Sequence, residues 1–404
     1  MCIMRSVSTA GHAGRSPGQN EEEQPVADVI ERVRTRRVRV NHRGDWVFVQ
    51  LLTRDGRCGI GELSHSGDDV LACRLVQDVA PFLVGYDPLR TSDVRAEAPG
   101  TSLLDRLRAR LAADRAGQTV LSALEQALLD LEGQVRGVPV WRLLGTRLRR
   151  RVPLYANINR ATVDRSPEGF AANARAAVQE GFRAVKLAPF DDLPRGAAAT
   201  PEGRAKIALG IERVRAVREA IGPAVELLVD CHARLDEQRA VQVARALEDV
   251  RLYWYEEPVS WRLEDGAVLA RLRRATGLPI ATGESIFGPE PFARLAKQAA
   301  ADIFMPDVKH AGGLRMCVEI GRIAHEHGLA LSPHNPSGPV ACAASLHIAA
   351  VLPAFTILEY AWGEVPWRGR LVSPAEEVRD GSLAVPDMPG LGITLNEQVL
   401  EEHA

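Results

Sequence analysis

Three acidic residues recur at nearly even intervals in the second half of the chain. Asp230, Glu256 and Glu284 each end a short apolar run, and 26 and 28 residues separate them. If the runs are neighbouring parallel strands, about 4.8 Å apart, the three carboxylates converge at one edge of a sheet. Such charges repel one another unless a cation lies between them, and an all-oxygen site of this kind suits Mg²⁺. The alternative is that these residues only cap the helices that follow.

Two histidines stand in positions that suit proton transfer. Asp307 ends one apolar run and His334 ends the next, so their side chains are expected to be neighbours. A carboxylate beside an imidazole orients the ring and raises its pKa, as a general base requires. His232 lies two residues after Asp230, so strand alternation returns it to the same side, where it would serve as an acid. A purely structural role is the alternative for each histidine.

Other polar residues close the remaining runs. Lys186 ends the second run in a chain that has only four lysines, and its compact charge suits an enolate oxygen better than an arginine would. Glu359 ends the last run and would polarise a substrate carboxylate or bind an arginine. Asn157, Asn159 and Arg160 follow the first run and are predicted to contact substrate hydroxyls.

The elements that must position these residues alternate regularly after about residue 150. Short apolar runs are separated by amphipathic helical stretches with clear boundaries, such as Ser166-Pro167-Glu168 at one start. Eight strands alternating with helices over about 220 residues predict a (β/α) barrel with catalytic residues at the C-terminal strand ends. A doubly wound open sheet is the alternative, but no GxGxxG or Walker sequence follows the first strand. The expected strands are Val152–Ala156, Ala184–Ala188, Leu227–Asp230, Leu252–Glu256, Ile280–Gly283, Ile303–Pro306, Ala330–Ser332 and Thr356–Glu359.

The first third of the chain has a different pattern. Alternating strands with a hairpin turn at Asp55-Gly56 precede an amphipathic helical stripe that Gly137 closes. The last thirty residues are again strand and turn, and we expect them to return to this first domain. The predicted organisation is a disordered tail (1–24), an α+β domain (25–150, completed by about 375–404) and the barrel (151–374).

Composition narrows the functional class. The chain has 404 residues, of which 46% are hydrophobic and 25% charged, and its net charge of −2 disfavours nucleic acid and anionic membranes as partners. Six scattered cysteines without a CxxC pair indicate a reducing compartment rather than a disulfide framework or a zinc ribbon. The N-terminus does not read as a signal peptide, and the apolar stretch Val340–Trp362 divides into a buried helix and a strand. We therefore expect a cytoplasmic protein.

Several of these sequences, taken together, resemble the mandelate racemase/muconate lactonizing enzyme branch of the enolase superfamily. The resemblance covers nearly the whole chain after about residue 30. It is carried by the three acidic residues, by MPDVKHAGG and SPHNPSGP around Asp307 and His334, and by ALEQALLDLEGQVRGVPVWRLLG and VPDMPGLGI outside the barrel. It implies an α/β fold, a modified TIM barrel (β/α)7β with an N-terminal α+β capping domain, and Mg²⁺-assisted removal of the proton α to a carboxylate.

The second barrel strand departs from the racemase pattern. Racemases carry two lysines there, one residue apart, and the second is a base; here Lys186 matches the first and Ala188 replaces the second. The sequence DCHAR from Asp230 and the PHNPSGP around His334 resemble instead the galactonate-dehydratase type of sugar-acid dehydratase. In that type, a histidine at the position of His334 removes the C2 proton, and one at the position of His232 protonates the departing C3 hydroxyl.

The resemblance therefore implies a Mg²⁺-dependent hydro-lyase that converts an aldonate or a similar sugar acid into a 2-keto-3-deoxy sugar acid. An epimerase or racemase that uses the two histidines on opposite faces of its substrate is the first alternative, and a non-catalytic ligand-binding or regulatory homologue is the second. A small carboxylate is the expected partner, and a homo-oligomer is the expected assembly. The expected residues are His334, Asp307, His232, Lys186 and Glu359 for catalysis, Asp230, Glu256 and Glu284 for the metal, and Asn157, Asn159, Arg160, Asp45, Trp46 and His65 for the substrate.

Overall fold

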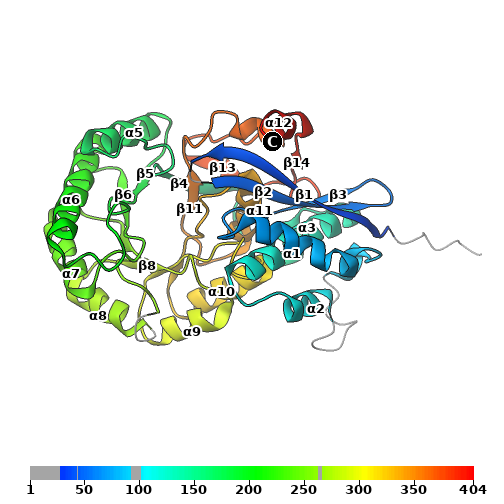
Figure 1. Cartoon of the computed structure of the whole chain (residues 1–404), viewed down its shortest axis with the longest axis horizontal. Helices are drawn as coiled ribbons and strands as arrows, with labels where there is room; N and C mark the ends of the chain where they lie inside the picture. Colours follow the sequence, from blue (N-terminus) through cyan, green and yellow to red (C-terminus); the bar gives the residue numbers. More distant parts are fainter. Residues whose placement is uncertain (1–27, 43, 92–101, 263–265) are drawn as a thin grey trace, which may run out of the picture.

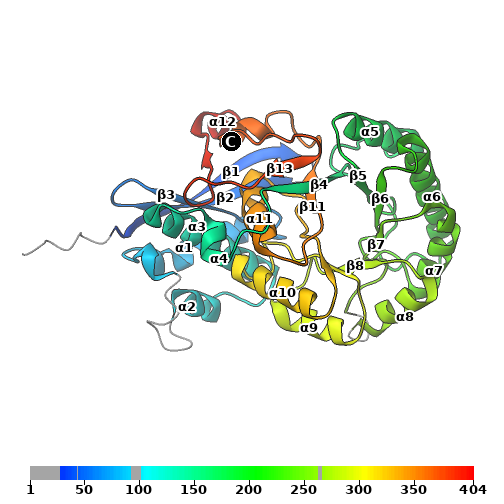
Figure 2. The same cartoon turned by 180° about the vertical axis from the view of Figure 1, so that it is seen from behind.

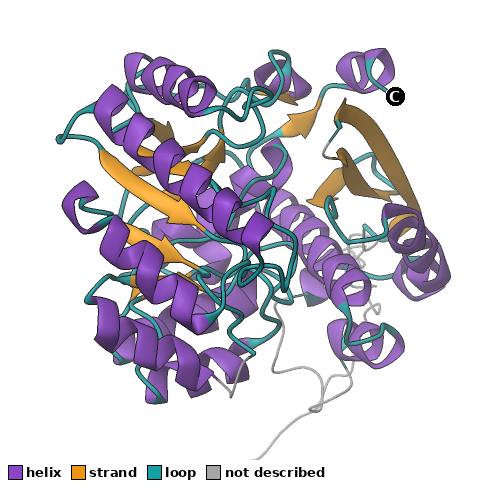
Figure 3. Ribbon diagram, turned by 60° about the vertical axis from the view of Figure 1, so that its left-hand side comes forward, coloured by secondary structure: helices purple, strands orange, loops and turns teal. Residues whose placement is uncertain are grey.

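Two domains lie side by side in the protein, one built around an antiparallel sheet and the other around a ring of parallel strands (Figures 1 and 2). The structure is a computed structural model that describes residues 28–42, 44–91, 102–262 and 266–404. The predicted disordered tail, residues 1–24, lies outside the described residues. Figure 3 shows helices surrounding the parallel strands, as the alternating sequence pattern predicts.

The first domain caps the barrel with a three-stranded sheet and its helices. The sheet has the order β1-β2-β3, and the turn at Asp55-Gly56 joins β2 to β3 as predicted. The apolar stripe of α3 packs on Val47, Val49 and Leu51 of β2, and α3 is followed by Gly137 in the left-handed conformation, with φ +66°. The elements are β1 Ile30–Asn41, β2 Gly44–Thr53, β3 Cys58–Glu62, α1 Asp69–Leu83, α2 Leu103–Arg110, α3 Arg115–Arg136 and α4 Val140–Leu144.

The second domain is a closed ring of eight parallel strands, from β4 to β11 in sequence order. The ring closes where the backbone of Leu331 in β10 bonds to Ala354 and Thr356, just before β11, at 2.8 and 2.9 Å. The strands are β4 Arg151–Asn157, β5 Ala184–Leu187, β6 Glu226–Asp230, β7 Trp254–Glu256, β8 Ile280–Thr282, β9 Ile303–Phe304, β10 Ala330–Leu331 and β11 Leu358–Ala361.

Seven α-helices separate the eight strands of the ring, which confirms the predicted (β/α)7β barrel. In the described chain, β11 leads to a 3₁₀ helix at Arg368–Leu371 rather than to an eighth α-helix. The helices are α5 Pro167–Gln179, α6 Pro201–Ile221, α7 Glu237–Ala246, α8 Ala267–Thr276, α9 Pro289–Lys297, α10 Leu314–Glu326 and α11 Pro339–Val351.

Alternation along the barrel strands points every second side chain into the barrel. The inward side chains of the lower layer form a separate buried apolar cluster, which includes Tyr155, Leu228 and Trp254. Two residues further along these strands come Asn157, Asp230 and Glu256, at the C-terminal ends. The apolar cluster is therefore the floor on which the polar strand ends stand.

The C-terminal segment connects both domains. Strand β13, Ser382–Ala384, pairs with the start of β4, and β12, Val372–Ser373, pairs with β14, Thr394–Leu395. The prediction of strand and turn missed the final helix, α12 Glu397–Glu402. This helix has only six residues, and the side chain of Asn396 caps it by accepting hydrogen bonds from the backbone N–H groups of Gln398 and Val399. The sequence therefore marks it by one capping residue and not by a periodic apolar stripe.

A buried glutamate of the capping domain holds the start of α11 in the barrel. The Glu62 carboxylate accepts hydrogen bonds from the backbone of Gly338 at 2.7 Å and Ala341 at 2.8 Å, and from the Ser64 hydroxyl at 2.8 Å. A Cβ on Gly338 would lie 2.9 Å from this carboxylate, so glycine permits the approach. Burial raises the pKa of Glu62, and the helix N-terminus favours its charged form.

We expect Glu62→Ala to lower the free energy of unfolding by about 2–4 kcal/mol, because it leaves two buried amides without an acceptor at about 1–3 kcal/mol each. Thermal unfolding followed by circular dichroism measures the change, with Glu219→Ala as the control, since Glu219 is exposed on α6. A melting temperature for Glu62→Ala equal to that of the control would show that this contact does not hold the domains together.

Candidate active site

Neighbouring strand ends bring the predicted acidic residues together. Asp230 and Glu256 are the last residues of β6 and β7 and are paired in register, and Glu284 follows the end of β8 by two residues. Lys186 lies in β5, on the other side of β6. The regular spacing in the sequence thus corresponds to consecutive strands around one barrel mouth.

Lys186 is the centre of the carboxylate cluster. Its fully buried ammonium lies 3.0 and 3.1 Å from the two oxygens of Glu256, 3.1 Å from Glu359 and 3.9 Å from Asp230. Burial alone would lower the pKa of Lys186, but Glu256 and Glu359 raise it well above its usual value. The lysine is therefore a fixed positive charge and not a base.

Glu359 is held from three sides. Besides Lys186, it accepts hydrogen bonds from Asn157 Nδ2 at 2.5 Å and from the backbone N–H of Asn335 at 2.8 Å. Burial opposes its charge, but Lys186 and these donors lower its pKa. Glu359 was predicted either to polarise a substrate carboxylate or to bind an arginine. In the structure it is paired with a cation, and that cation is Lys186.

His334 has the surroundings of a general base. Its Nδ1 lies 2.7 Å from Asp307 Oδ2, as the sequence predicted for adjacent strand ends. Burial would raise the pKa of Asp307, but Lys309, His310 and His334 lower it well below its usual value. An ionised Asp307 accepts a hydrogen bond from Nδ1–H, which leaves Nε2 of His334 as the nitrogen that faces the cavity.

His232 is held between two carboxylates. Nε2 lies 2.8 Å from Asp230 Oδ2, and Nδ1 lies 2.5 Å from Asp191 Oδ1. Burial would lower the pKa of His232, but Asp230 and Asp191 raise it well above its usual value. Both ring nitrogens therefore face carboxylate oxygens, an arrangement that suits a proton donor.

His232 and His334 follow strands that stand opposite each other. They come after β6 and β10, which are four strands apart in a ring of eight. The two rings therefore reach the cavity from opposite sides.

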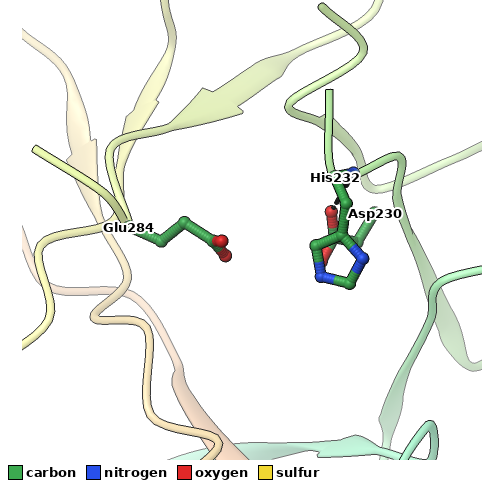
Figure 4. A group of neighbouring side chains, drawn as sticks. All are labelled: Asp230, His232 and Glu284. Carbon is green, nitrogen blue, oxygen red and sulfur yellow. Dashed lines mark hydrogen bonds and ion pairs between the residues drawn. The ribbon is translucent and has the colours of Figure 1, made fainter. Parts of the chain in front are cut away.

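The carboxylates at the mouth have too little positive charge beside them. Ligand atoms of Asp230, His232 and Glu284 lie within 4.8 Å of one another, with Glu284 pointing across the mouth toward the other two (Figure 4). Among the described residues, no hydrogen-bond donor reaches the buried Oε2 of Glu284, although His334 Nε2 approaches it to 3.2 Å. Burial and the charges of Glu284 and Asp230 raise the pKa of Glu257 to about 8. The group of Asp230, His232 and Glu284 fits a divalent cation.

Glu256 is not part of that group, because its carboxylate is turned toward Lys186 and accepts a hydrogen bond from Trp254 Nε1 at 3.0 Å. Its role as the third metal ligand therefore stays a prediction.

One cavity joins these groups to residues of the capping domain. His65 and Arg115 from the cap line it, and Arg160 bonds to both His65 Nε2 at 2.9 Å and Glu364 at 2.8 Å. His65 has φ +63°, a conformation that is strained for a non-glycine residue. The other lining residues are Asn157, Asn159, Lys186, Asp230, His232, Glu284, Lys309, His310, His334, Pro336 and Glu359.

Two predicted substrate contacts lie outside this cavity. Trp46 is fully buried and its ring meets that of Trp367 edge-on at 5.4 Å, while Asp45 binds Arg37 at 2.5 Å. Trp46 does not reach the cavity because the alternation of side chains along β2 turns it into the core beneath the sheet. The structure therefore does not bring these two residues to the cavity.

Sequence reasoning missed four residues around the cavity. Asp191 lies in the loop after β5, Lys309 and His310 follow Asp307, and Arg115 begins α3. A signal existed for Lys309, since it is one of only four lysines in the chain and is fully buried beside Asp307, at 3.0 Å. The other three lie in loops or in the capping domain, where strand order does not predict side-chain direction.

Comparison with known proteins agrees with this geometry. Residues 28–145 match the mandelate racemase/muconate lactonizing enzyme N-terminal domain, and residues 169–399 match the enolase C-terminal domain-like family. The chain belongs to the mandelate racemase/muconate lactonizing enzyme family of the enolase superfamily. The resemblance seen in the sequence is therefore confirmed, and metal binding at a barrel mouth is typical of this superfamily.

Curated relatives in this family include several sugar-acid dehydratases. The chain is 33% identical to a D-galactonate dehydratase of Ralstonia nicotianae, covering 89% of this chain and 91% of the relative. It is 30% identical to a D-xylonate dehydratase of Haloferax volcanii, covering 89% and 85%. A crystal structure of a mandelate racemase/muconate lactonizing enzyme-like protein from Rubrobacter xylanophilus superposes with a TM-score of 0.82 at 34% identity, over 94% of this chain and 98% of the other.

In the described part of this family member, no helix is long and apolar enough to cross a membrane. Val340–Trp362 forms α11 and β11, as predicted.

We expect a divalent cation to raise the melting temperature, because a ligand of the folded state at 100 times its dissociation constant stabilises by about 2.7 kcal/mol. Glu284→Gln should lose most of this shift, whereas Glu290→Gln, an exposed change on α9, should keep it. Thermal shift titrations with MgCl₂ and MnCl₂ measure both. An unchanged shift in Glu284→Gln would place the cation elsewhere.

Proposed function

We propose that this protein is a Mg²⁺-dependent dehydratase that converts an aldonate or a similar sugar acid into its 2-keto-3-deoxy product. The observation that carries the proposal is the different surroundings of its two histidines: His334 is oriented by Asp307 alone as a base, and His232 lies between two carboxylates, as suits an acid. Elimination of water needs one group of each kind, whereas epimerisation needs two groups that exchange roles.

The metal site would combine three strand ends. Asp230, Glu256 and Glu284 would hold Mg²⁺, which suits oxygen ligands and keeps positions for the substrate. When bound, the ion supplies a Lewis acid that stabilises negative charge on the substrate carboxylate. Lys186, already fixed by Glu359, would place a second positive charge beside that carboxylate.

The protein side chains then divide the proton transfers. His334 Nε2 takes the proton from C2, while Asp307 keeps the ring in the required orientation. The C2 electron pair forms the C2–C3 double bond as the C3–O bond breaks, and His232 donates its proton to the departing hydroxyl, which leaves as water. The enol formed in this way tautomerises to the 2-keto-3-deoxy acid.

A racemase or epimerase is the second candidate, because His232 and His334 approach the cavity from opposite sides. Against it, Ala188 stands where racemases of this family carry their lysine base, and the pKa of His232 is raised well above its usual value by Asp230 and Asp191 despite burial. A ring whose two nitrogens both contact carboxylates is poorly placed to accept a proton from a substrate.

We expect turnover of at least one sugar acid in a panel of aldonates and aldarates incubated with Mg²⁺, with 2-keto acid detected by semicarbazide. EDTA should abolish the activity, and His334→Asn should lower kcat by about 10²–10⁴-fold, the usual contribution of a general base. Exchange of the C2 proton for deuterium without a keto product would favour the epimerase instead.

His232→Asn separates the acid role from metal ligation, since His232 also belongs to the cation-binding group. If His232 is the acid, this variant should lose about 10²–10⁴-fold in kcat and keep the Mg²⁺ affinity of the wild type in a calorimetric titration. A parallel loss of Mg²⁺ affinity would make His232 a ligand and remove it from the acid role.

A further inference from the structure

One cation of the cavity has no acidic partner. Lys186 is neutralised by Glu256 and Glu359, Lys309 by Asp307, and Arg160 by Glu364. Arg115 differs, because no described carboxylate lies within ion-pair distance of its guanidinium, and its charge is left for a ligand. The neighbouring Asp114 is engaged elsewhere, as it caps α3 through the backbone N–H of Gly117 at 2.9 Å.

The guanidinium of Arg115 is nevertheless held in place. Nε donates to the backbone oxygen of His65 at 3.0 Å, and Nη2 lies 3.0 Å from Nε2 of His310. Because arginine can only donate, Nε2 of His310 is the acceptor, so the ring proton is on Nδ1 and is donated to Thr119 at 2.8 Å. Thr119 in turn donates to the backbone oxygen of Arg115 at 2.6 Å, which closes the ring of bonds.

The partners of Arg115 do not cancel its charge. Burial, despite Asp307 nearby, lowers the pKa of His310 well below its usual value, so this ring is neutral. Burial and then Arg160 lower the pKa of His65 in the same way. The capping side of the cavity therefore presents an oriented guanidinium among neutral groups.

Arg115 also lies where the cavity meets a second pocket. It lines both the cavity over the strand ends and an outer pocket between the start of α3 and the loops after β6, β7 and β8. That outer pocket is of mixed charge, because Arg195 and Arg262 line it together with Asp114 and Glu257. Arg115 is thus the guanidinium that lines both pockets.

We propose that Arg115 binds a second carboxylate, at the far end of the substrate, so that the preferred substrate class is a sugar diacid rather than a monoacid. This inference rests on the proposed function for the end of the substrate at Lys186 and the metal. A planar guanidinium suits a carboxylate because its parallel N–H groups match the two oxygens.

Matched pairs of monoacid and diacid test the proposal with the full-length protein and Mg²⁺. Gluconate with glucarate and galactonate with galactarate differ only at the terminal carbon. We expect kcat/KM to be at least tenfold higher for the diacid of a reactive pair. A monoacid that reacts equally well or better would overturn the proposal without touching the dehydratase assignment, and so would 6-phosphogluconate if it exceeded glucarate.

Arg115→Gln should bring the ratio of diacid to monoacid kcat/KM close to one, since loss of a charge-assisted bond reduces binding about 10–100-fold. The ratio is measured within one preparation, so a partly folded variant does not distort it. Arg115→Lys should give an intermediate ratio, and the exposed Arg175→Gln on α5 should keep the wild-type ratio. A diacid preference that survives Arg115→Gln would overturn the assignment.

A binding measurement tests whether Arg115 binds a second carboxylate even if none of these acids reacts. Adipate and hexanoate differ by one terminal carboxylate and cannot be dehydrated. In thermal shift titrations with Mg²⁺, adipate should stabilise the wild type more than hexanoate, and Arg115→Gln should abolish that difference. Equal shifts in the wild type would overturn the proposal, while absence of turnover on every acid would count against the dehydratase function alone.

Discussion

The crowding of buried carboxylates around one lysine is the constraint on which the site depends. Lys186 is within 4 Å of Glu256, Glu359 and Asp230, and Glu284 and Glu257 lie close by. One ammonium cannot neutralise the charge of so many buried carboxylates. The barrel holds the groups together because each stands at the end of a strand whose lower part packs in the apolar floor. Folding energy from that floor thus maintains an arrangement that is ready for a divalent cation.

The base side of the cavity depends on the capping domain in a different way. Ser122 and Gln126 of α3 bond to the backbone of Gly312 and Val308, at 3.1 and 3.3 Å, and so hold the loop that carries Asp307. Lys309 in the same loop keeps Asp307 ionised. The orientation of His334 therefore depends on contacts between domains, whereas the metal end depends on the barrel alone.

Periodicity and spacing predicted most of the fold and the charged strand ends. Apolar runs mark buried parallel strands because both faces of such strands are covered, and strand order then places Asp230, Glu256 and Glu284 together. Asp191 and Arg115 could not be found in this way, because loop conformation and domain docking decide where they point. Trp46 shows the opposite failure: it was expected to contact the substrate, but its side chain is fully buried.

The path of the C-terminal segment limits how the two domains can be exchanged between proteins during evolution. After β11 the chain pairs with β4, donates the Leu391 amide to Asp130 of α3 at 2.8 Å, and places Glu397 against Arg34 of β1 at 3.0 Å. Both domains are thus completed by the segment that follows the barrel. If recombination exchanged residues of the capping domain alone, the C-terminal segment of the recipient protein would not match the new cap. New substrate specificities are therefore expected to arise by point substitutions in the cap rather than by exchange of the whole domain.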